Sequence, residues 1–260
     1  MASAFSDHYS AVADSYARFR PRYPPELFTW LATHSPGRGL AWDCATGNGQ
    51  AAAALVEHFE RVVASDASAA QVARAGRHSR CAPRVALAEA SALPAAGADL
   101  VTVAQALHWF DLERFWPEVH RVLRPGGLVA VWCYQLFSST PAVDRVIARF
   151  YHEVVGPYWP PERAILERGY GDVPFPFEEL AAPPFAMAAD WDLEHLLGYL
   201  GTWSATRRYQ ARHGADPREQ IGAELSAAWG AVERRRLRWP LLVRAGRTSG
   251  ASPALRSRRR

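Results

Sequence analysis

The segment Leu-Ala-Trp-Asp-Cys-Ala-Thr-Gly-Asn-Gly at residues 40–49 constrains this chain more than any other part of it. Its first five residues are an apolar run typical of a buried strand, and Asp43 lies near the end of that run. Gly47 and Gly49 then allow the backbone to turn sharply and to approach a ligand closely. The alanine-rich residues 51–55 predict a helix whose first N–H groups face the turn. We therefore expect a ligand site between this strand and this helix.

Beyond residue 40, runs that predict strands alternate with runs that predict helices. The expected strands cover residues 40–44, 61–66, 84–89, 100–105, 128–134, 185–191 and 237–244. Helices are expected from Gln50, Ser68 and Leu112, over the amphipathic run at 143–155, and at 193–209 and 217–234. Alternation of this kind predicts an α/β fold with a mostly parallel sheet, and the late strand pair predicts an antiparallel addition at one edge.

The composition removes several classes of chemistry. All 30 side chains counted as lysine or arginine are arginine, which excludes a lysine Schiff base, a lysine general base and the lysine of a P-loop. Cys44, Cys81 and Cys133 lie far apart, and Cys44 and Cys133 lie in apolar runs. We interpret them as small core residues and expect no protein-held metal.

The positive charge is concentrated at the C-terminus. Four arginines there supply the whole formal charge of +4, so residues 1–255 balance to zero; they are Arg256, Arg258, Arg259 and Arg260. A basic tail can contact nucleic acid or a membrane, but an exposed terminus rich in Ser, Gly and Pro is more often disordered. The chain has no apolar run of about 18 residues, and its N-terminus lacks a basic and an apolar signal region. We therefore expect a cytoplasmic protein without a membrane contact.

Two ligands fit the glycine turn. Residues 47–52 satisfy the dinucleotide fingerprint G-x-G-x-x-A, and Asp66 follows near the expected spacing, as in an NAD(P)-dependent oxidoreductase. Asp43 disfavours a pyrophosphate, because like charges repel in a semi-buried cleft. A carboxylate at that position suits a cationic ligand better, and S-adenosylmethionine carries an ammonium, a sulfonium and no phosphate.

Residues 43–49 resemble the acid-x-Gly-x-Gly-x-Gly loop of class I S-adenosylmethionine-dependent methyltransferases, with Ala45 in place of the first glycine. The resemblance continues in order through residues 64–68, 88–94, 99–110 and 122–128. It is closest to the small-molecule methyltransferases of type 11, including trans-aconitate methyltransferase-like proteins, whose N-terminal pattern is similar to residues 16–24. The resemblance implies a Rossmann-like seven-stranded sheet, mostly parallel with one antiparallel strand, a helical N-terminal lid and an insertion after strand five.

The same resemblance implies the domain organisation and the reaction. The expected parts are a helical lid at 1–35, a cofactor-binding core at 36–135, a helical insertion over the substrate site at 136–184, the C-terminal part of the core sheet at 185–247, and a disordered basic tail at 248–260. The expected activity is direct displacement at the sulfonium methyl of S-adenosyl-L-methionine by a small molecule, which leaves S-adenosyl-L-homocysteine. A non-catalytic protein that binds this cofactor remains an alternative, as does the oxidoreductase.

The family's cofactor-binding residues carry over to matching positions of this sequence. They are Asp43, Ala45, Gly47 and Gly49 at the turn, Asp66 and Ala67 at the ribose, Glu89 and Ala90 at the adenine, and Gln105 and Ala106 after the fourth strand. Asp66 has an alternative as a turn acid or helix cap. Asp43 could likewise be a structural acid bonded to nearby backbone N–H groups.

Two residues are candidates for catalysis. His108 follows the fourth strand and could take a proton from the substrate, although a neutral, packed histidine is the alternative. Tyr16 could cover the sulfonium, although an aromatic stripe more often packs a helix.

The methyl acceptor is expected to be a small acidic or aromatic molecule. Nucleic acid is disfavoured as a substrate, because residues 105–108 read Gln-Ala-Leu-His where amino-methyltransferases of nucleic acids carry Asn/Asp-Pro-Pro-aromatic. The near-neutral body of the chain disfavours it as well. The protein is expected to be a monomer or a homodimer.

Overall fold

The computed structural model describes residues 19–75 and 78–248 of the chain. Its centre is one sheet in the order β3-β2-β1-β4-β5-β8-β6, with β7 also paired to β8. The strands are β1 (Leu40–Cys44), β2 (Arg61–Asp66), β3 (Cys81–Val85), β4 (Ala98–Ala104), β5 (Leu123–Tyr134), β6 (Glu178–Leu180), β7 (Phe185–Trp191) and β8 (Arg235–Arg247).

Helices connect these strands and extend beyond them. The α-helices in the described residues are α2 (Pro25–His34), α3 (Gln50–Leu55), α4 (Ala69–Arg74), α5 (Leu112–Val122), α6 (Pro141–Arg149), α7 (Arg163–Glu167), α8 (Leu193–Gly201), α9 (Ser204–His213) and α10 (Gly222–Trp229). Shorter helical turns are η2 (Leu107–Trp109), η3 (Phe150–Val154), η4 (Gly156–Tyr158) and η5 (Pro217–Gln220). Several starts follow local capping chemistry: the Ser68 hydroxyl accepts from the Gln71 N–H, and the Asp192 carboxylate accepts from the His195 N–H.

The predicted mostly parallel sheet with one antiparallel strand is confirmed. β1 pairs in parallel with β2 and β4, and β5 in parallel with β4, whereas β8 runs antiparallel to β5. Two strands share the outer edge of β8, since β6 pairs with one part of it and β7 with another. Residues 181–184 separate them, and Pro183 and Pro184 have no N–H for a ladder. The sheet therefore has eight strands in seven positions.

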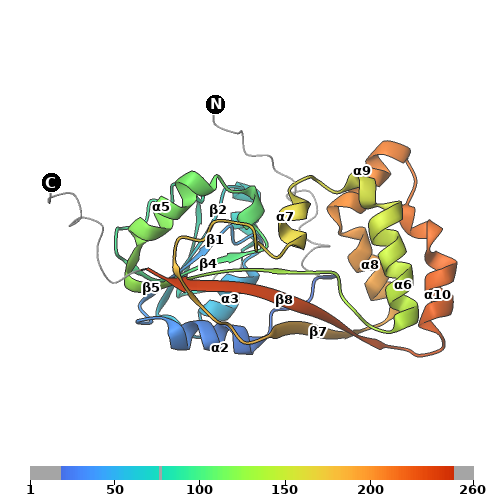
Figure 1. The fold of residues 1–260 in the computed structure, drawn as a ribbon, viewed down its shortest axis with the longest axis horizontal. Helices are drawn as coiled ribbons and strands as arrows, with labels where there is room; N and C mark the ends of the chain where they lie inside the picture. The colour runs from blue at the N-terminus through green and yellow to red at the C-terminus, as the bar shows by residue number, and fades with distance from the viewer. Residues whose placement is uncertain (1–18, 76–77, 249–260) are drawn as a thin grey trace.

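Helices cover both faces of the sheet, with α5 on one face and α2 and α3 on the other (Figure 1). β5 illustrates the alternation: Val129 and Val131 belong to the core cluster of α5, whereas Ala130 and Trp132 belong to that of α2. Within the segment 1–35, residues 25–34 form a layer of the core, because the apolar side chains of α2 lie on the sheet.

A group of helices lies at one end of the long strands β5, β7 and β8 (Figure 1). α6 packs against α10, and α8 packs against α9, so the helices after β7 join those of the expected insertion. α7 stands between this group and the sheet, where it contacts η2 after β4.

Several element boundaries differ from prediction, among them those of one strand and two helices. The third strand lies at Cys81–Val85 instead of 84–89, because this edge strand is only partly buried and has little apolar pattern. The helix expected at 193–209 is divided at Thr202 and Trp203 into α8 and α9. The helix expected at 217–234 consists of η5 and α10 and ends at Gly230, whose φ of 68° stops it.

The C-terminal part of the described chain is attached to the core. Thr248, where the tail was expected to begin, is buried and donates from its backbone N–H to the Gly127 carbonyl. Residues 249–260 lie outside the described residues. No helix within 19–75 or 78–248 combines the length and the apolar character that a membrane crossing needs.

Candidate functional site

The turn after β1 lies where the strand order of the sheet reverses. β1 has β2 on one side and β4 on the other, so the strand order reverses between β1 and β4. In open α/β sheets, ligands bind in the crevice at the carboxyl ends of the strands at such a switch point. The connections after β1 and β4 both contain left-handed residues: φ is 54° at Ala45, 56° at Gly47, 82° at Gly49 and 59° at Gln105. A left-handed backbone is uncommon at alanine and glutamine, and such strain concentrates at functional sites.

The space in front of Gly47 is open. A Cβ added at Gly47 would meet no heavy atom of the protein within 4 Å. Gly49 is the left-handed N-cap of α3, and the side chain of Gln50 donates to the Pro21 carbonyl at 3.1 Å. The hydrogen bond of Gln50 therefore holds the turn in place, and the space beside Gly47 is open to a ligand.

Asp66 connects the end of β2 to this turn. Its Oδ2 accepts a hydrogen bond from the Gly47 N–H at 2.9 Å, and its Oδ1 accepts from the Ser68 N–H at 2.9 Å. The side chain is buried, with 9% of the residue exposed. The contacts fit the turn-acid alternative, yet each carboxylate oxygen can accept a second hydrogen bond from a ligand.

Asp43 is enclosed behind the turn. Its two carboxylate oxygens accept from the hydroxyls of Thr46 at 2.6 Å and Thr102 at 2.8 Å, and 1% of the residue is exposed. Burial, with a smaller effect of the charge of Asp66, raises the pKa of Asp43 to about 6 against these hydrogen bonds. Asp43 therefore holds the shape of the turn and, once ionised, adds negative charge behind it.

Gln105 and Ala106 begin the connection after β4. The Gln105 N–H donates to the Trp132 carbonyl at 2.9 Å, which fixes the left-handed residue beside β5. The Nε2 atom of Gln105 is buried and has no hydrogen-bond partner among the described residues, and Ala106 is buried beside it in sequence. A buried donor without an acceptor is costly, so a bound acceptor fits this position. The open space beside Gly47 and this donor together fit a polar cofactor.

The remaining predicted cofactor residues lie at the ends of neighbouring connections. Ala67 is half-buried next to Asp66, and Ala90 is exposed. The Glu89 side chain accepts from the Asp111 N–H at 3.0 Å, so it connects its loop to the start of α5. Ser91, the residue after Ala90, donates from its backbone N–H to the Glu118 carboxylate of α5 at 2.8 Å.

His108 lies in η2, against the segment that follows α7. Its Nδ1 is 3.1 Å from the hydroxyl of Tyr170, and the two rings are stacked with centroids 6.1 Å apart. Burial, together with the charge of Arg163, lowers the pKa of His108 to about 3. These contacts favour the neutral, packed alternative, because a base this weak binds few protons near neutral pH.

Tyr16, the other catalytic candidate, lies outside the described residues. The segment that follows it crosses toward the helix group. Arg20 hydrogen-bonds to the Tyr134 hydroxyl at the end of β5 and lies 5.1 Å from the ring centroid of Tyr199 in α8. Phe19 contacts the ring of His195 with centroids 5.1 Å apart.

Sequence reasoning did not identify the partners of the predicted residues. Thr46 could have been found from its place three residues after Asp43, whereas Thr102 comes from β4 and leaves no local signal. Tyr170 and Arg163 lie in a segment without a clear motif. Tertiary packing alone brings them to the loop after β4.

Comparisons with known proteins agree with this geometry. A family model described as a methyltransferase domain matches residues 42–131. A "Putative methyltransferase" of Dictyostelium discoideum is 31% identical over 229 residues, which cover 86% of this chain and 87% of that protein.

Solved structures extend the similarity to the fold. A "Putative Type II Methyltransferase" from Anaeromyxobacter dehalogenans is 49% identical with a TM-score of 0.85, covering 90% of this chain and 100% of that one. A "putative methyltransferase" from Bacillus halodurans C-125 shares the fold at 16% identity and a TM-score of 0.51, covering 86% and 98%. This similarity over most of both chains selects methyl transfer over the oxidoreductase alternative. The chain therefore belongs to the class I S-adenosylmethionine-dependent methyltransferases.

Proposed function

We propose that this enzyme methylates a small molecule, with S-adenosylmethionine held in the crevice between the connections after β1 and β4. The observation that carries the proposal is the Gly47 turn, whose N–H is held by Asp66 and whose front is open. Gln105, in the connection after β4, would supply a second polar contact, because its buried Nε2 donor has no partner among the described residues.

Each predicted residue has a role in this proposal. Asp66, with Ala67, would bind the ribose hydroxyls through the lone pairs that Gly47 and Ser68 leave. Glu89 and Ala90 would line the adenine, and Gln105 and Ala106 would close the crevice. The turn residues Ala45, Gly47 and Gly49 would approach the methionine end. Asp43 would act through the shape of the turn and through its charge, which attracts a cation.

The reaction needs alignment more than proton removal. When bound, the cofactor supplies a sulfonium methyl: the acceptor's bond to the methyl carbon forms as the carbon–sulfur bond breaks, and sulfur keeps the electron pair. The chain's contribution is to hold the acceptor in line with that bond and to exclude water. The lowered pKa of His108 supports a role in packing with Tyr170 over one as proton acceptor. The role proposed for Tyr16 over the sulfonium stays a prediction.

A small acceptor is supported by the helix group beside the carboxyl edge of the sheet. The helices of this group lie beyond this edge (Figure 1), and Arg20 and Phe19 contact Tyr134 and His195 there, which favours a small acceptor over a macromolecule. An acidic or aromatic acceptor, the trans-aconitate methyltransferase-like subgroup, and a monomer or homodimer remain predictions. Nucleic acid remains disfavoured for the reasons of charge and motif.

Calorimetry tests the cofactor site. We expect S-adenosylmethionine and S-adenosylhomocysteine to bind and NADH not to bind. Asp66→Ala should weaken that binding by about 1–3 kcal/mol through loss of charge-assisted hydrogen bonds. Asp172→Ala, which removes an exposed carboxylate paired with Arg168, is the matched control and should bind like the wild type. An unchanged dissociation constant in Asp66→Ala would contradict the ribose assignment.

A transfer assay tests the acceptor. The cofactor carrying a labelled methyl group is incubated with a panel of small acids, phenols and amines, and with oligonucleotides. Label on a small molecule supports the proposal. Label on oligonucleotides alone would overturn the substrate class, and tight cofactor binding with no transfer to any compound would favour a cofactor-binding protein without catalysis.

A further inference from the structure

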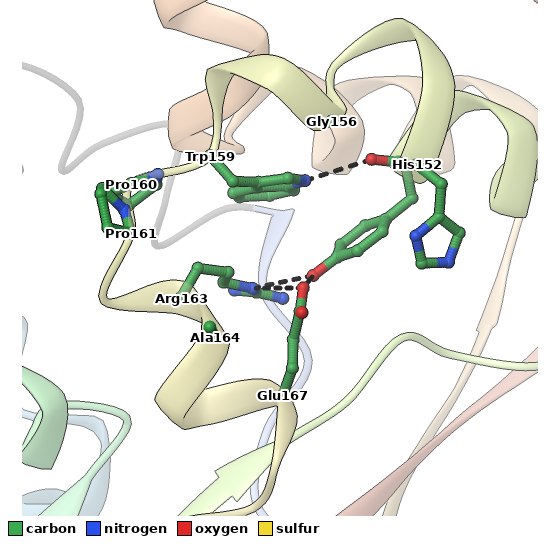
Figure 2. Close-up of a pocket in the computed structure, with 9 residues that line it drawn as sticks. His152, Gly156, Trp159, Pro160, Pro161, Arg163, Ala164 and Glu167 are labelled. Atoms are coloured by element: carbon green, nitrogen blue, oxygen red, sulfur yellow. Dashed lines mark hydrogen bonds and ion pairs between the residues drawn. The ribbon is translucent and has the colours of Figure 1, made fainter.

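A pocket of about 280 Å³ lies outside the cofactor crevice, between the helix group and the sheet (Figure 2). η3, η4 and α7 form it, together with the two prolines before α7. The residues that line it are Tyr151, His152, Gly156, Trp159, Pro160, Pro161, Arg163, Ala164 and Glu167. Its volume is at the small end for ligand pockets, so it suits a small molecule or one end of a larger one.

Arg163 is the centre of this pocket. Its guanidinium lies over the indole of Trp159, 4.5 Å from the ring centroid, and 5.5 Å from that of Tyr151. Its Nε donates to the Tyr151 hydroxyl at 2.9 Å, and its side chain is 23% exposed. Three contacts thus fix the plane of the guanidinium before any ligand arrives, which lowers the entropy lost on binding.

The two terminal nitrogens of Arg163 remain available. Within the described part of the chain, every hydrogen bond and ion pair of Arg163 uses Nε, so Nη1 and Nη2 donate to no protein atom. The fork of an arginine side chain matches the two oxygens of a carboxylate. A half-buried, oriented arginine whose fork is used by none of residues 19–75 and 78–248 is a candidate anion site.

Glu167 neutralises this charge only in part. Its carboxylate oxygen is 3.8 Å from the Nε atom, it accepts a hydrogen bond from the Tyr151 hydroxyl, and its side chain is 45% exposed. Burial raises the pKa of Tyr151, so its hydroxyl is neutral at ordinary pH. The negative charge of Glu167 therefore lies beside the Nε atom of Arg163, as the two side chains in Figure 2 show.

The pocket adjoins the loop that follows β4. α7, which begins at Arg163, packs against η2, which contains His108. The positive charge of Arg163 lowers the pKa of His108 in the same direction as burial does. It also lowers the pKa of Cys133, there against the effect of burial, so its charge acts on both groups. Gln135, just after β5, donates to the Glu167 carbonyl at 3.0 Å. The arginine is therefore close to the carboxyl edge at which a methyl acceptor would lie.

We propose that Arg163 binds a carboxylate of the methyl acceptor, with Trp159 and Tyr151 as the aromatic walls of its pocket. The inference rests on the proposed function and narrows the acceptor to a small organic acid. Arg163 is a binding residue in this proposal and takes no part in breaking or forming bonds. Phosphate shares this recognition chemistry, so the experiment separates the two anions.

The test measures binding of defined probes to protein saturated with S-adenosylhomocysteine. The probes are benzoate, citrate, benzamide as the neutral counterpart of benzoate, and inorganic phosphate. Their binding is measured by calorimetry and by the shift of the NMR signal of the Arg163 Nε–H. We expect benzoate or citrate to bind and to shift that signal, and benzamide not to bind. Arg163→Gln should weaken carboxylate binding by about tenfold or more, because a charge-assisted pair is lost.

Three further variants complete the design. Arg168→Gln removes the same charge from the end of α7, where Arg168 pairs with Asp172 on the surface, and should bind like the wild type. Glu167→Gln removes the neighbouring negative charge and should bind carboxylates more tightly. Arg163→Lys keeps the charge without the fork and should fall between wild type and Arg163→Gln, which keeps the test valid if Arg163→Gln fails to fold.

The outcomes separate this inference from the proposed function. Failure of the wild type to bind S-adenosylhomocysteine would overturn the proposed cofactor site. Normal cofactor binding with no carboxylate bound, or with equal carboxylate affinity in wild type and Arg163→Lys, would overturn the inference alone. Binding of inorganic phosphate but of neither carboxylate, lost in Arg163→Gln, would assign the pocket to a phosphorylated acceptor and overturn the carboxylate.

Discussion

The substitution Asp43→Asn should remove the free-energy cost of ionising a buried carboxyl group in the folded protein. Burial raises the pKa of Asp43 from 3.8 to about 6, despite hydrogen bonds from Thr46 and Thr102. The folded protein therefore binds this proton more tightly than the unfolded chain. Its ionisation destabilises the fold as pH rises through the interval from about 4 to about 6, and the contribution is complete above about pH 6.

The size of the effect follows from the shift. A difference of about 2 pH units corresponds to about 3 kcal/mol of unfolding free energy at neutral pH. An asparagine cannot ionise, and the hydroxyls of Thr46 and Thr102 can each donate or accept, so both hydrogen bonds can re-form. We expect the stability difference, wild type minus Asp43→Asn, to fall by about 3 kcal/mol from about pH 4 to about pH 7.

The assay is urea unfolding followed by tryptophan fluorescence across that pH range, with S-adenosylmethionine affinity measured by calorimetry at neutral pH. Asp190→Asn, at an exposed carboxylate paired with Arg236, controls for the change of charge. We expect Asp43→Asn to bind the cofactor more weakly while its stability is kept, because a negative charge near a cation is lost. A stability difference that stays flat with pH, or rises with it, would refute the reasoning.

The other predictions concern the turn, the histidine and the loop behind the adenine segment. Gly47→Ala should cost about 1 kcal/mol of stability, because φ is 56° at this position, and should lower cofactor affinity much more. Gly126→Ala is the control: its φ is 75° and the space around it is equally open, but it lies at the opposite edge of the sheet and should cost stability only. His108→Gln should leave the pH profile of kcat/KM unchanged in shape, because the pKa of His108 is lowered to about 3, chiefly by burial; loss of an acidic limb near pH 6 in the variant would contradict this. Glu118→Gln should lose about 2 kcal/mol of unfolding free energy at neutral pH, because hydrogen bonds with Arg121 lower the pKa of Glu118 to about 2. In the wild type, thermal unfolding should show that this stability disappears as pH falls from about 4.5 toward 2.

Local patterns were enough for the part of the fold that carries the cofactor site. The strands expected at 40–44 and 61–66 are confirmed at their predicted bounds, because a continuous apolar run buried on both faces leaves a clear signal. The predicted position of the edge strand β3 was wrong by a few residues, because this strand pairs with β2 at the sheet edge, contains Pro83 and is nowhere fully buried. Helix breaks at 202–203 and after η5 depended on contacts between helices, which periodicity does not report.

The sequence by itself determined the glycine turn, the strand and helix order and, through the ordered motifs, the cofactor class. These features are local, since a turn and the acid beside it lie within a few residues of one another. Tertiary structure decided what the side chains do. Asp43 is buried and hydrogen-bonded to Thr102 of another strand, and His108 is neutral because it is buried against Tyr170 and near the charge of Arg163. The pocket of Arg163 arises from packing between segments that no motif connects, so only the folded chain contains it.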